Sequence, residues 1–301
     1  GSSWLPTFMG MLGIPFVWSA GLRDSMPLRF LKAMSRRAKL QEIVRSVAMR
    51  FLGSATDYLT ASRSSMILTS SDESLWKASL PVQRFLVGGL PEEELEKLAT
   101  LSGRSQKRTF RIISIGRLLG WKGFSLGLTA FARFQYKIPS SEYWVIGDGP
   151  ERIHLERLAT DLKCRNKVHF LGWLSRSQVL NLLPEVDVLL HPSFHEQFGY
   201  VLLEGMAAGK PIICLDVAGP SLLVPEAGGY KVSVLNREQV VNDISQALYE
   251  LASDHKKRRN MGDFARHWAA SRWNWDHIGE ELLDLYDSVL SRDRVTVGSN
   301  C

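Results

Sequence analysis

Short apolar runs alternate with longer segments of helical periodicity over the C-terminal part of the chain. The runs are rich in Val, Ile and Leu and are bounded by Gly or Pro, a pattern typical of buried parallel strands. They occupy residues 111–115, 143–146, 168–171, 186–190 and 211–214. Because helical segments separate them, the pattern predicts an α/β fold with a complete, doubly wound parallel sheet.

Three later segments of this region have clear boundaries. Residues 199–208 are amphipathic and are followed by Gly209 and Pro211, which are typical helix stop signals. The final helix is expected to begin at Asn274, a residue well suited to cap a helix N-terminus. Residues 220–226 are expected to form a turn-rich loop, and the helix after it presents an apolar face made of Val240, Val241, Ile244, Leu248 and Leu251.

The first 103 residues give shorter and less regular elements. Strands are expected at residues 14–18 and 66–69 and near Phe85, with a basic helix between the first two. This region has no glycine-rich first turn and starts at a strand without a preceding βαβ unit, so we expect a partial N-terminal domain in a fragment of a longer protein. Residues 88–108 combine glycines, a proline, glutamates and a basic stretch, which is typical of an interdomain hinge.

Length and composition favour two domains. A chain of 301 residues with 45% hydrophobic content can bury one large core or two smaller ones. The three cysteines are isolated and lack metal-ligand spacing, which argues against disulfides or a zinc site and fits a reducing cytoplasm. The apolar stretch at residues 8–22 is interrupted, is too short to span a bilayer and lacks the basic leader of a signal peptide.

The net charge of +6 is concentrated between Arg23 and Arg50, where eight basic residues face two acidic ones. The apolar residues of this segment fall partly at helical spacing, so one interpretation is an amphipathic helix that contacts an anionic membrane peripherally. We favour the simpler interpretation of a solvated basic face. Nucleic acid binding is disfavoured, because no recognition motif or base-stacking aromatic pattern accompanies the charge.

Residues 186–211 join an apolar strand to a helix through a loop that holds two histidines and a carboxylate. In an open α/β sheet, ligands bind beyond the carboxyl ends of the strands, and the N–H groups of a helix start attract anions. A phosphate is therefore the expected ligand of this loop. It would repel Glu196 and Glu204, so we expect these carboxylates to bind hydroxyl groups on either side, one on a sugar and one on a ribose. This arrangement predicts a nucleotide sugar.

The first strand of the regular region leads into Gly116, Arg117, Lys122 and Gly123. A glycine at a strand end lets the backbone approach a ligand, and the two cations would lie at the carboxyl edge of the sheet. If the anion is a diphosphate, they would stabilise the charge that develops as it leaves. Taken alone, the motif favours the simpler interpretation of two surface cations at a helix start.

Three further strand ends supply candidates for binding. Gly147 and Gly149 resemble a dinucleotide fingerprint, but Arg152 replaces the third glycine, so a tight turn under a base or ribose is favoured. Leu171 and its neighbours could flank a base or could simply pack. Phe198 and Tyr200 are residue types more often found in cores than stacked on ligands, and Gly199 between them leaves its N–H accessible.

His191 and His195 are four residues apart and lie beside Glu196, which superficially resembles a metal site. Pro192 and Ser193 prevent the helix that would bring both imidazoles to one side. We therefore expect no metal here.

Several of these segments together resemble the C-terminal domain of retaining GT-B glycosyltransferases of family 4. The resemblance covers residues 110–290. It rests on GRLLGWKG at 116–123, IGDGPE at 146–151, VHFLGWLS at 168–175, PSFHEQFGYVLLEGMAAGKPII at 192–213 with its two glutamates eight apart, and SRWNWD at 271–276. Upstream, GIPFVW and residues 68–73 are similar to the latter part of that family's first domain. The resemblance implies two Rossmann-like domains: a partial acceptor-side domain at 1–103, a donor domain at 104–271, and a helix at 272–301 that crosses back.

The resemblance also assigns roles to residues. Arg117 and Lys122 would contact the diphosphate, Glu196 the donor sugar and Glu204 the ribose, while Gly199 and its neighbours would offer N–H groups. We take Arg117, Lys122 and Glu196 as candidate catalytic residues. The candidate substrate-binding residues are Gly116, Gly149, Leu171, Phe198, Gly199, Tyr200 and Glu204.

The implied activity is transfer of a sugar, with retained configuration, from a nucleoside diphosphate sugar to a glycan or lipid-linked acceptor. No cofactor or obligatory metal is expected. The family's N-terminal glycine-rich loop is missing from this sequence, so we expect the chain alone to bind donor better than it turns it over. Two alternatives remain open: a nucleotide-sugar epimerase, and a non-catalytic donor-binding subunit that needs a partner. The sequence leaves the base, the sugar and the acceptor undetermined.

Overall fold

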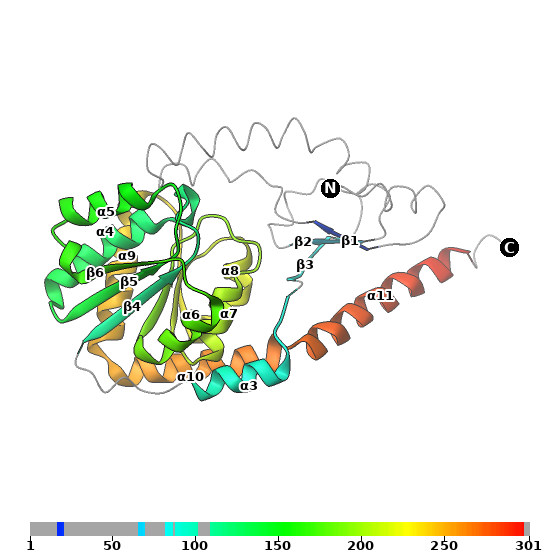
Figure 1. The fold of residues 1–301 in the computed structure, drawn as a ribbon. Coiled ribbons are helices and arrows are strands. Elements are labelled where there is room, and N and C mark those ends of the chain that lie inside the picture. The colour runs from blue at the N-terminus through cyan, green and yellow to red at the C-terminus, as the bar shows by residue number, and fades with distance from the viewer. Residues whose placement is uncertain (1–16, 21–65, 70–81, 87, 102–108, 298–301) are drawn as a thin grey trace.

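The computed structural model describes residues 17–20, 66–69, 82–86, 88–101 and 109–297. Most of these residues form one α/β domain with a six-stranded sheet at its centre (Figure 1). The expected basic helix and the charged segment from Arg23 to Arg50 lie outside the described residues.

All six strands of this sheet are parallel, in the order β6-β5-β4-β7-β8-β9. Counted from the first strand of the domain, this is the 3-2-1-4-5-6 order of doubly wound folds, and the order in which strands are added to the sheet reverses between β4 and β7. The strands are β4 (Phe110–Ile115), β5 (Ser141–Ile146), β6 (Val168–Gly172), β7 (Val188–His191), β8 (Ile212–Leu215) and β9 (Gly229–Val232). The five predicted strands and the doubly wound sheet are confirmed, and β9 is an additional strand.

Helices cover both faces of the sheet and bury two separate apolar cores. One face carries α4 (Phe124–Lys137), α5 (Arg152–Asp161) and α9 (Arg237–Ser253). The other carries α3 (Glu92–Thr100), α6 (Arg176–Leu182), α7 (Tyr200–Ala207), α8 (Ala218–Leu223) and α10 (His255–Arg272). Short 3-10 turns complete the domain: η3 (Gly120–Lys122), η4 (Arg165–Lys167), η5 (Leu183–Glu185) and η6 (Glu226–Gly228).

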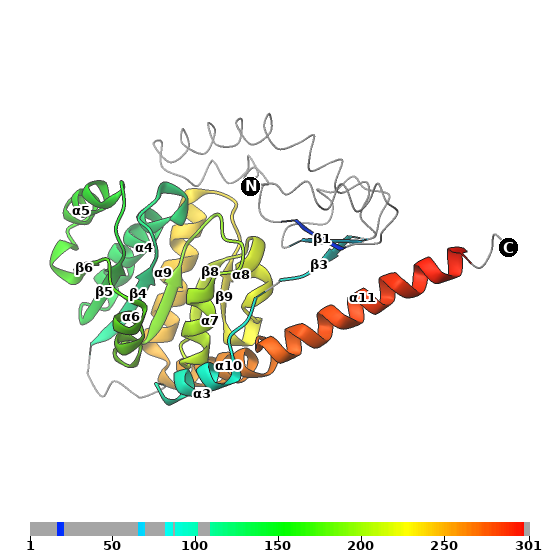
Figure 2. The same ribbon diagram turned by 45° about the vertical axis from the view of Figure 1, so that its right-hand side comes forward.

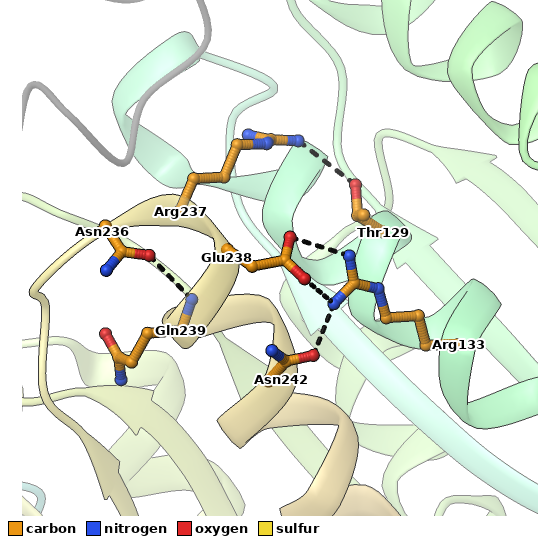
Figure 3. A network of polar contacts seen from close by, with 7 residues as sticks. All are labelled: Thr129, Arg133, Asn236, Arg237, Glu238, Gln239 and Asn242. Atoms are coloured by element: carbon orange, nitrogen blue, oxygen red, sulfur yellow. Dashed lines mark hydrogen bonds and ion pairs between the residues drawn. The ribbon is translucent and has the colours of Figure 1, made fainter.

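Polar side chains fasten α9 to α4 on the first of these faces (Figure 3). The Arg133 guanidinium donates to both carboxylate oxygens of Glu238, at 2.8 and 2.9 Å, and to Asn242. Arg237 donates to the Thr129 hydroxyl at 3.2 Å, and Asn236 accepts the Gln239 N–H at the start of α9. These contacts lie at the rim of the apolar core and fix the two helices relative to one another.

A smaller parallel sheet precedes this domain. Its strands are β1 (Val17–Ala20), β2 (Met66–Thr69) and β3 (Val82–Arg84), in that spatial order. The strand predicted at 66–69 is confirmed, and the one predicted at 14–18 overlaps β1. The last helix, α11 (Trp275–Val297), runs outward from the large domain and passes below this sheet in both views (Figures 1 and 2). Phe85 packs against Val289 of that helix, as do Leu282 and Leu285.

The segment that enters the large domain after β3 lies beside the segment that leaves it before α11. Leu90 forms a parallel bridge with Asn274, in which the Leu90 N–H donates to the Trp273 carbonyl at 2.9 Å. The Asn274 side chain accepts the His277 N–H at 2.7 Å, which confirms the predicted start of the last helix.

The structure differs from two expectations about connecting segments. The stretch 88–108, predicted to be a hinge, contains α3, which packs against α7 and α10 and buries Leu95 and Leu98. The loop predicted at 220–226 overlaps the short helix α8. Among the described helices, none is both long enough and apolar enough to cross a membrane. The domain boundaries after residues 103 and 271 stay predictions.

Candidate functional site

The site begins with three glycines at the carboxyl edge of the large sheet. Gly116 follows β4, Gly147 follows β5 and Gly172 ends β6, with φ angles of 154°, 125° and 71°. A Cβ atom on Gly147 would lie 2.0 Å from the Gly116 carbonyl oxygen, so a side chain there could not be accommodated. These three neighbouring strands therefore end in residues without side chains, at the same edge of the sheet.

The loop after β4 is docked on the loop after β5. Leu118 donates its N–H to the Asp148 carbonyl at 2.9 Å, and its own carbonyl accepts the Glu151 N–H at 3.0 Å. A Cβ on Gly149 would lie 2.6 Å from the Leu118 oxygen. Gly149 therefore permits a close backbone contact that holds Arg117 and its neighbours at the carboxyl edge.

The same β4 loop also contacts the loop that follows β7. The Phe194 N–H donates to the Trp121 carbonyl at 2.9 Å, and a Cβ on Gly123 would lie 1.9 Å from the Pro192 oxygen. On its far side, the β7 loop is held at the start of α8, where the Gly219 N–H donates to the Glu196 carbonyl at 3.2 Å. The loop is thus fixed between two others on adjacent strands.

This packing brings Lys122 and His191 onto one carboxylate, that of Glu196. The Lys122 ammonium contacts Oε2 of Glu196, and His191 Nε2 lies 3.2 Å from the same oxygen. The side chains of Lys122 and Glu196 are 19% and 20% exposed and that of His191 only 6%, so the three form a largely buried cluster.

The Glu196 carboxylate is held ionised by its neighbours. Burial raises the pKa of this carboxyl, but the hydrogen bond from His191 and the charge of Lys122 outweigh it and bring the pKa to about 2. An ionised carboxylate accepts hydrogen bonds and donates none, so Glu196 is suited to bind hydroxyl groups.

His191 belongs to this cluster and was not among the predicted site residues. Sequence reasoning considered it as a metal ligand only. Its position as the last residue of a strand, at the edge where ligands bind, was the signal that could have identified it. Among the described residues, no group of three or more His, Cys, Asp or Glu side chains is arranged to hold a metal ion.

Helix α7 starts directly after this loop. Gly199 caps it with φ 92°, and a Cβ there would approach Leu202 and Glu196 at 3.1 and 3.4 Å. The positive end of the α7 dipole therefore lies beside the Glu196 loop. Of the two predicted aromatics, Tyr200 is 46% exposed, but Phe198 is 7% exposed and packs edge-on against Trp273 at 5.5 Å between ring centroids. The Phe198 ring is thus packed in the core, and the role of Phe198 in substrate binding stays a prediction.

Glu204 lies in the second turn of α7 and is 8% exposed. Arg176, at the start of α6, donates from Nε to Oε1 of Glu204 at 2.5 Å and contacts Glu94 of α3 through another nitrogen. Burial raises the pKa of Glu204, and Arg176 offsets part of that rise. Sequence reasoning did not find Arg176, because its partners are distant in the sequence.

The remaining predicted residues lie at the same edge. Leu171, near the end of β6, is 38% exposed, and Trp173 just after the strand is 76% exposed. Arg117 follows Gly116 and is exposed, and it forms no ion pair with any of the residues described. The structure therefore joins Lys122 to Glu196, and Arg117 lies in the same loop as Lys122.

The fold and the site define a class: a doubly wound α/β domain whose bare strand ends, cations and carboxylates meet at the topological switch point. A family model described as "Glycosyl transferases group 1" matches residues 99–268, more than half of the chain. The chain belongs to this family, the retaining GT-B glycosyltransferases of family 4.

Individual relatives agree with this assignment. The lipopolysaccharide core biosynthesis glycosyltransferase LpsE of Rhizobium meliloti (strain 1021) is 29% identical over 178 residues, which cover 59% of this chain and 49% of that protein. The chain spans about half the length of the curated relatives it matches.

Solved structures share the fold. The sucrose-phosphate synthase of Thermosynechococcus elongatus superposes with a TM-score of 0.64 at 19% identity, covering 96% of this chain and 72% of that one. The Anabaena protein Alr3699/HepE in complex with UDP and glucose gives 0.58 at 20% identity, covering 93% of this chain and 73% of that one. The GT-B-like fold expected from the sequence is confirmed.

Proposed function

We propose that this chain supplies the donor site of a retaining glycosyltransferase that moves a sugar from a nucleoside diphosphate sugar to a glycan or lipid-linked acceptor. The observation that carries the proposal is the Lys122–Glu196–His191 cluster at the carboxyl edge of the sheet. A relative that acts in lipopolysaccharide core biosynthesis and a structural neighbour with UDP and glucose bound support it.

The chemistry follows from the charges at this edge. As the bond between the sugar and the diphosphate breaks, negative charge grows on the diphosphate, and Arg117 and Lys122 stabilise it without a metal. The start of α7 adds the positive end of a helix dipole. Lys122 is paired with Glu196 in this structure, so the incoming diphosphate shares this ammonium with the carboxylate.

Glu196 and Glu204 recognise the two ends of the donor. Glu196, kept ionised by Lys122 and His191, accepts hydrogen bonds from hydroxyl groups of the transferred sugar. Glu204 accepts hydrogen bonds from the hydroxyl groups of the ribose, and Leu171 and Tyr200 flank the nucleotide. Gly116 and Gly149 let the backbone approach the phosphates, and Gly199 offers its N–H.

The proposed organisation has residues 1–103 on the acceptor side, 104–271 on the donor side and 272–301 crossing back. Closure of two such domains expels water from the cleft, which limits hydrolysis of the donor. The complete protein is proposed to act at the cytoplasmic side, where donor sugars and lipid-linked acceptors meet. Peripheral contact with an anionic membrane through residues 23–50 is part of this proposal.

The test is a thermal shift screen of the chain against the diphosphates of uridine, guanosine and adenosine and their sugars. One nucleoside diphosphate should stabilise the chain by about 2.7 kcal/mol at a concentration a hundred times its Kd. Glu204→Ala should reduce this shift, and the exposed Glu92→Ala on α3 should not. Absence of any nucleotide-dependent shift would contradict the proposal.

Two further assays separate the alternative functions. Incubating the complete protein with donor alone would produce an isomerised sugar if it were an epimerase, and transfer to an added acceptor excludes that reading. If binding occurs but adding the N-terminal region of a complete relative restores no transfer, a non-catalytic donor-binding subunit is favoured.

A further inference from the structure

Arg176 is the first residue of α6, where the helix dipole weakly disfavours positive charge. Its backbone is fixed by a capping box in which Ser175 and Gln178 exchange hydrogen bonds. Two carboxylates contact this cation and offset its charge.

The two carboxylates come from different helices. Arg176 Nε donates to Oε1 of Glu204 on α7 at 2.5 Å, and Arg176 also contacts Oε1 of Glu94 on α3. The exposed fractions of the side chains are 52% for Arg176, 25% for Glu94 and 10% for Glu204. The guanidinium thus bridges from the protein surface to a nearly buried acid, with Glu94 as its outer anchor.

This contact acts on the charge and the orientation of Glu204. Burial raises the pKa of Glu204 and the nearby Glu94 raises it further, whereas Arg176 lowers it and so favours the ionised form. Arg176 engages Oε1, so the other carboxylate oxygen can accept hydrogen bonds from a ligand. An ionised carboxylate held in one orientation is a better acceptor for two adjacent hydroxyl groups than a neutral, rotating one.

We propose that Arg176 is a positioning residue for donor binding: held by Glu94, it orients the Glu204 carboxylate and keeps it ready to accept the ribose hydroxyls of a nucleoside diphosphate. This inference rests on the proposed nucleotide-sugar function and on the role of Glu204 within it. In this proposal Arg176 contacts the carboxylate of Glu204, and Glu204 contacts the nucleotide.

The test compares two ligands by calorimetry on the 301-residue chain: the nucleoside diphosphate that gives the largest thermal shift in the screen above, and its 2′,3′-dideoxy analogue. The chain should prefer the ribonucleotide roughly ten-fold or more, the size expected for hydrogen bonds to a charged group. Arg176→Met should weaken ribonucleotide binding and reduce the preference to about two-fold, while binding of the dideoxy analogue stays within about two-fold. If Arg176 had a merely structural role, Arg176→Met would weaken the binding of both ligands by the same factor.

Three variants complete the design. Arg176→Lys keeps a cation near Glu204 and should restore part of the preference, and it guards against a failure of Arg176→Met to fold. Glu94→Gln should give an intermediate loss, because the outer anchor is weakened. Arg133→Met removes an arginine paired with Glu238 on the opposite face and should leave the preference unchanged (Figure 3).

The outcomes separate this inference from the proposed function. If a nucleoside diphosphate binds, and Glu204→Gln abolishes the ribose preference while Arg176→Met keeps it, the role of Arg176 is wrong and the proposed function stands. If the chain shows no ribose preference, or binds no nucleoside diphosphate, the proposed role of Glu204 fails first and the inference falls with it.

Discussion

His191 Nε2 lies 3.2 Å from Oε2 of Glu196, the same carboxylate oxygen that the Lys122 ammonium contacts. His191 ends β7 and Lys122 ends η3 after β4, so two neighbouring strands of the sheet each deliver one donor to this oxygen. The backbone segments that carry Lys122 and His191 are held by the sheet and by loop hydrogen bonds. Their side chains therefore orient the carboxylate before a ligand binds, as expected of a preorganised site.

If the proposed glycosyltransferase activity is correct, replacing Lys122 by alanine should lower kcat more than it raises KM. The ammonium is proposed to stabilise charge that develops only as the diphosphate leaves, and such interactions contribute to the transition state more than to binding. A loss of about 10²- to 10³-fold in kcat is expected, with a small change in KM. Steady-state kinetics with varied donor measures both. A variant that raises KM and keeps kcat would show that Lys122 only docks the donor.

Glu196→Gln should make the chain less stable at neutral pH, by an amount that shrinks as the pH falls. The folded pKa of about 2 is below the ordinary 4.5, so the unfolded state binds more protons between these pH values. The stabilisation is therefore fully present above about pH 4.5 and is lost as the pH falls toward 2. From that shift, the substitution should cost about 3 kcal/mol at pH 7.

Urea unfolding of the wild type and Glu196→Gln between pH 7 and pH 3.5 measures this difference. The exposed Glu92→Gln on α3 is the matched control and should change stability by less than about 0.5 kcal/mol. A difference between wild type and Glu196→Gln that is constant over this range would rule out the ionised cluster as its cause.

Phe198→Ala should lower the stability of the fold and also weaken nucleotide binding, because Phe198 belongs to the loop between β7 and α7 that holds Glu196. The ring is buried between Trp273 and Tyr200, and the Gly88 backbone lies so close that a Cβ there would meet the ring at 2.8 Å. Truncating a buried Phe typically costs about 3 to 5 kcal/mol. Phe198→Leu, which fills most of the space, should recover much of this loss. Chemical unfolding and nucleotide titration measure the two effects. Weaker nucleotide binding at unchanged stability would instead indicate direct contact with the ligand.

The sheet could be predicted from the sequence because its central strands are short runs of uninterrupted apolar residues. Leu190 and Ile213, for example, are fully buried on strands whose every residue is buried. The strand β9 escaped prediction because Tyr230 and Lys231 in its middle are only partly buried, which removes the apolar run. Helix α8 was not predicted because Gly219 and Pro220 are turn-forming residues. The close approach of Gly219 to the Gln197 carbonyl depends on the folded structure and cannot be read from the sequence.

The candidate site could be predicted in its residue types and only partly in its pairings. Lys122 and Glu196 were expected at one edge because both follow parallel strands. The contact of both Lys122 and His191 with one oxygen of Glu196 depends on how two loops pack together. Lys122 and Glu196 are 74 residues apart, and spacing along the chain does not encode this packing. The pairing of Arg176 with Glu204 has the same origin. Phe198 shows the opposite limit: its place in the motif suggested a ligand contact, and tertiary packing against Trp273 buried it.

Lys210 provides a prediction about stability that is independent of the donor site. It precedes β8 and is 6% exposed, and burial lowers the pKa of its ammonium to about 8 although Asp187 opposes the change. Between about pH 8 and 10.5 the unfolded state therefore binds more protons than the folded one, so the contribution of Lys210 makes stability rise with pH. At pH 7 the buried charge costs about 3 kcal/mol by the same shift.

Lys210→Met should accordingly raise the free energy of unfolding at pH 7 by up to about 3 kcal/mol, since methionine fills a similar volume without the charge. It should also reduce the rise in stability between pH 8 and 10. Lys97→Met, at an exposed position of α3, is the control and should leave both quantities within about 0.5 kcal/mol. Unfolding by denaturant at several pH values measures them. A less stable Lys210→Met variant would mean that the ammonium gains more from Asp187 than its burial costs.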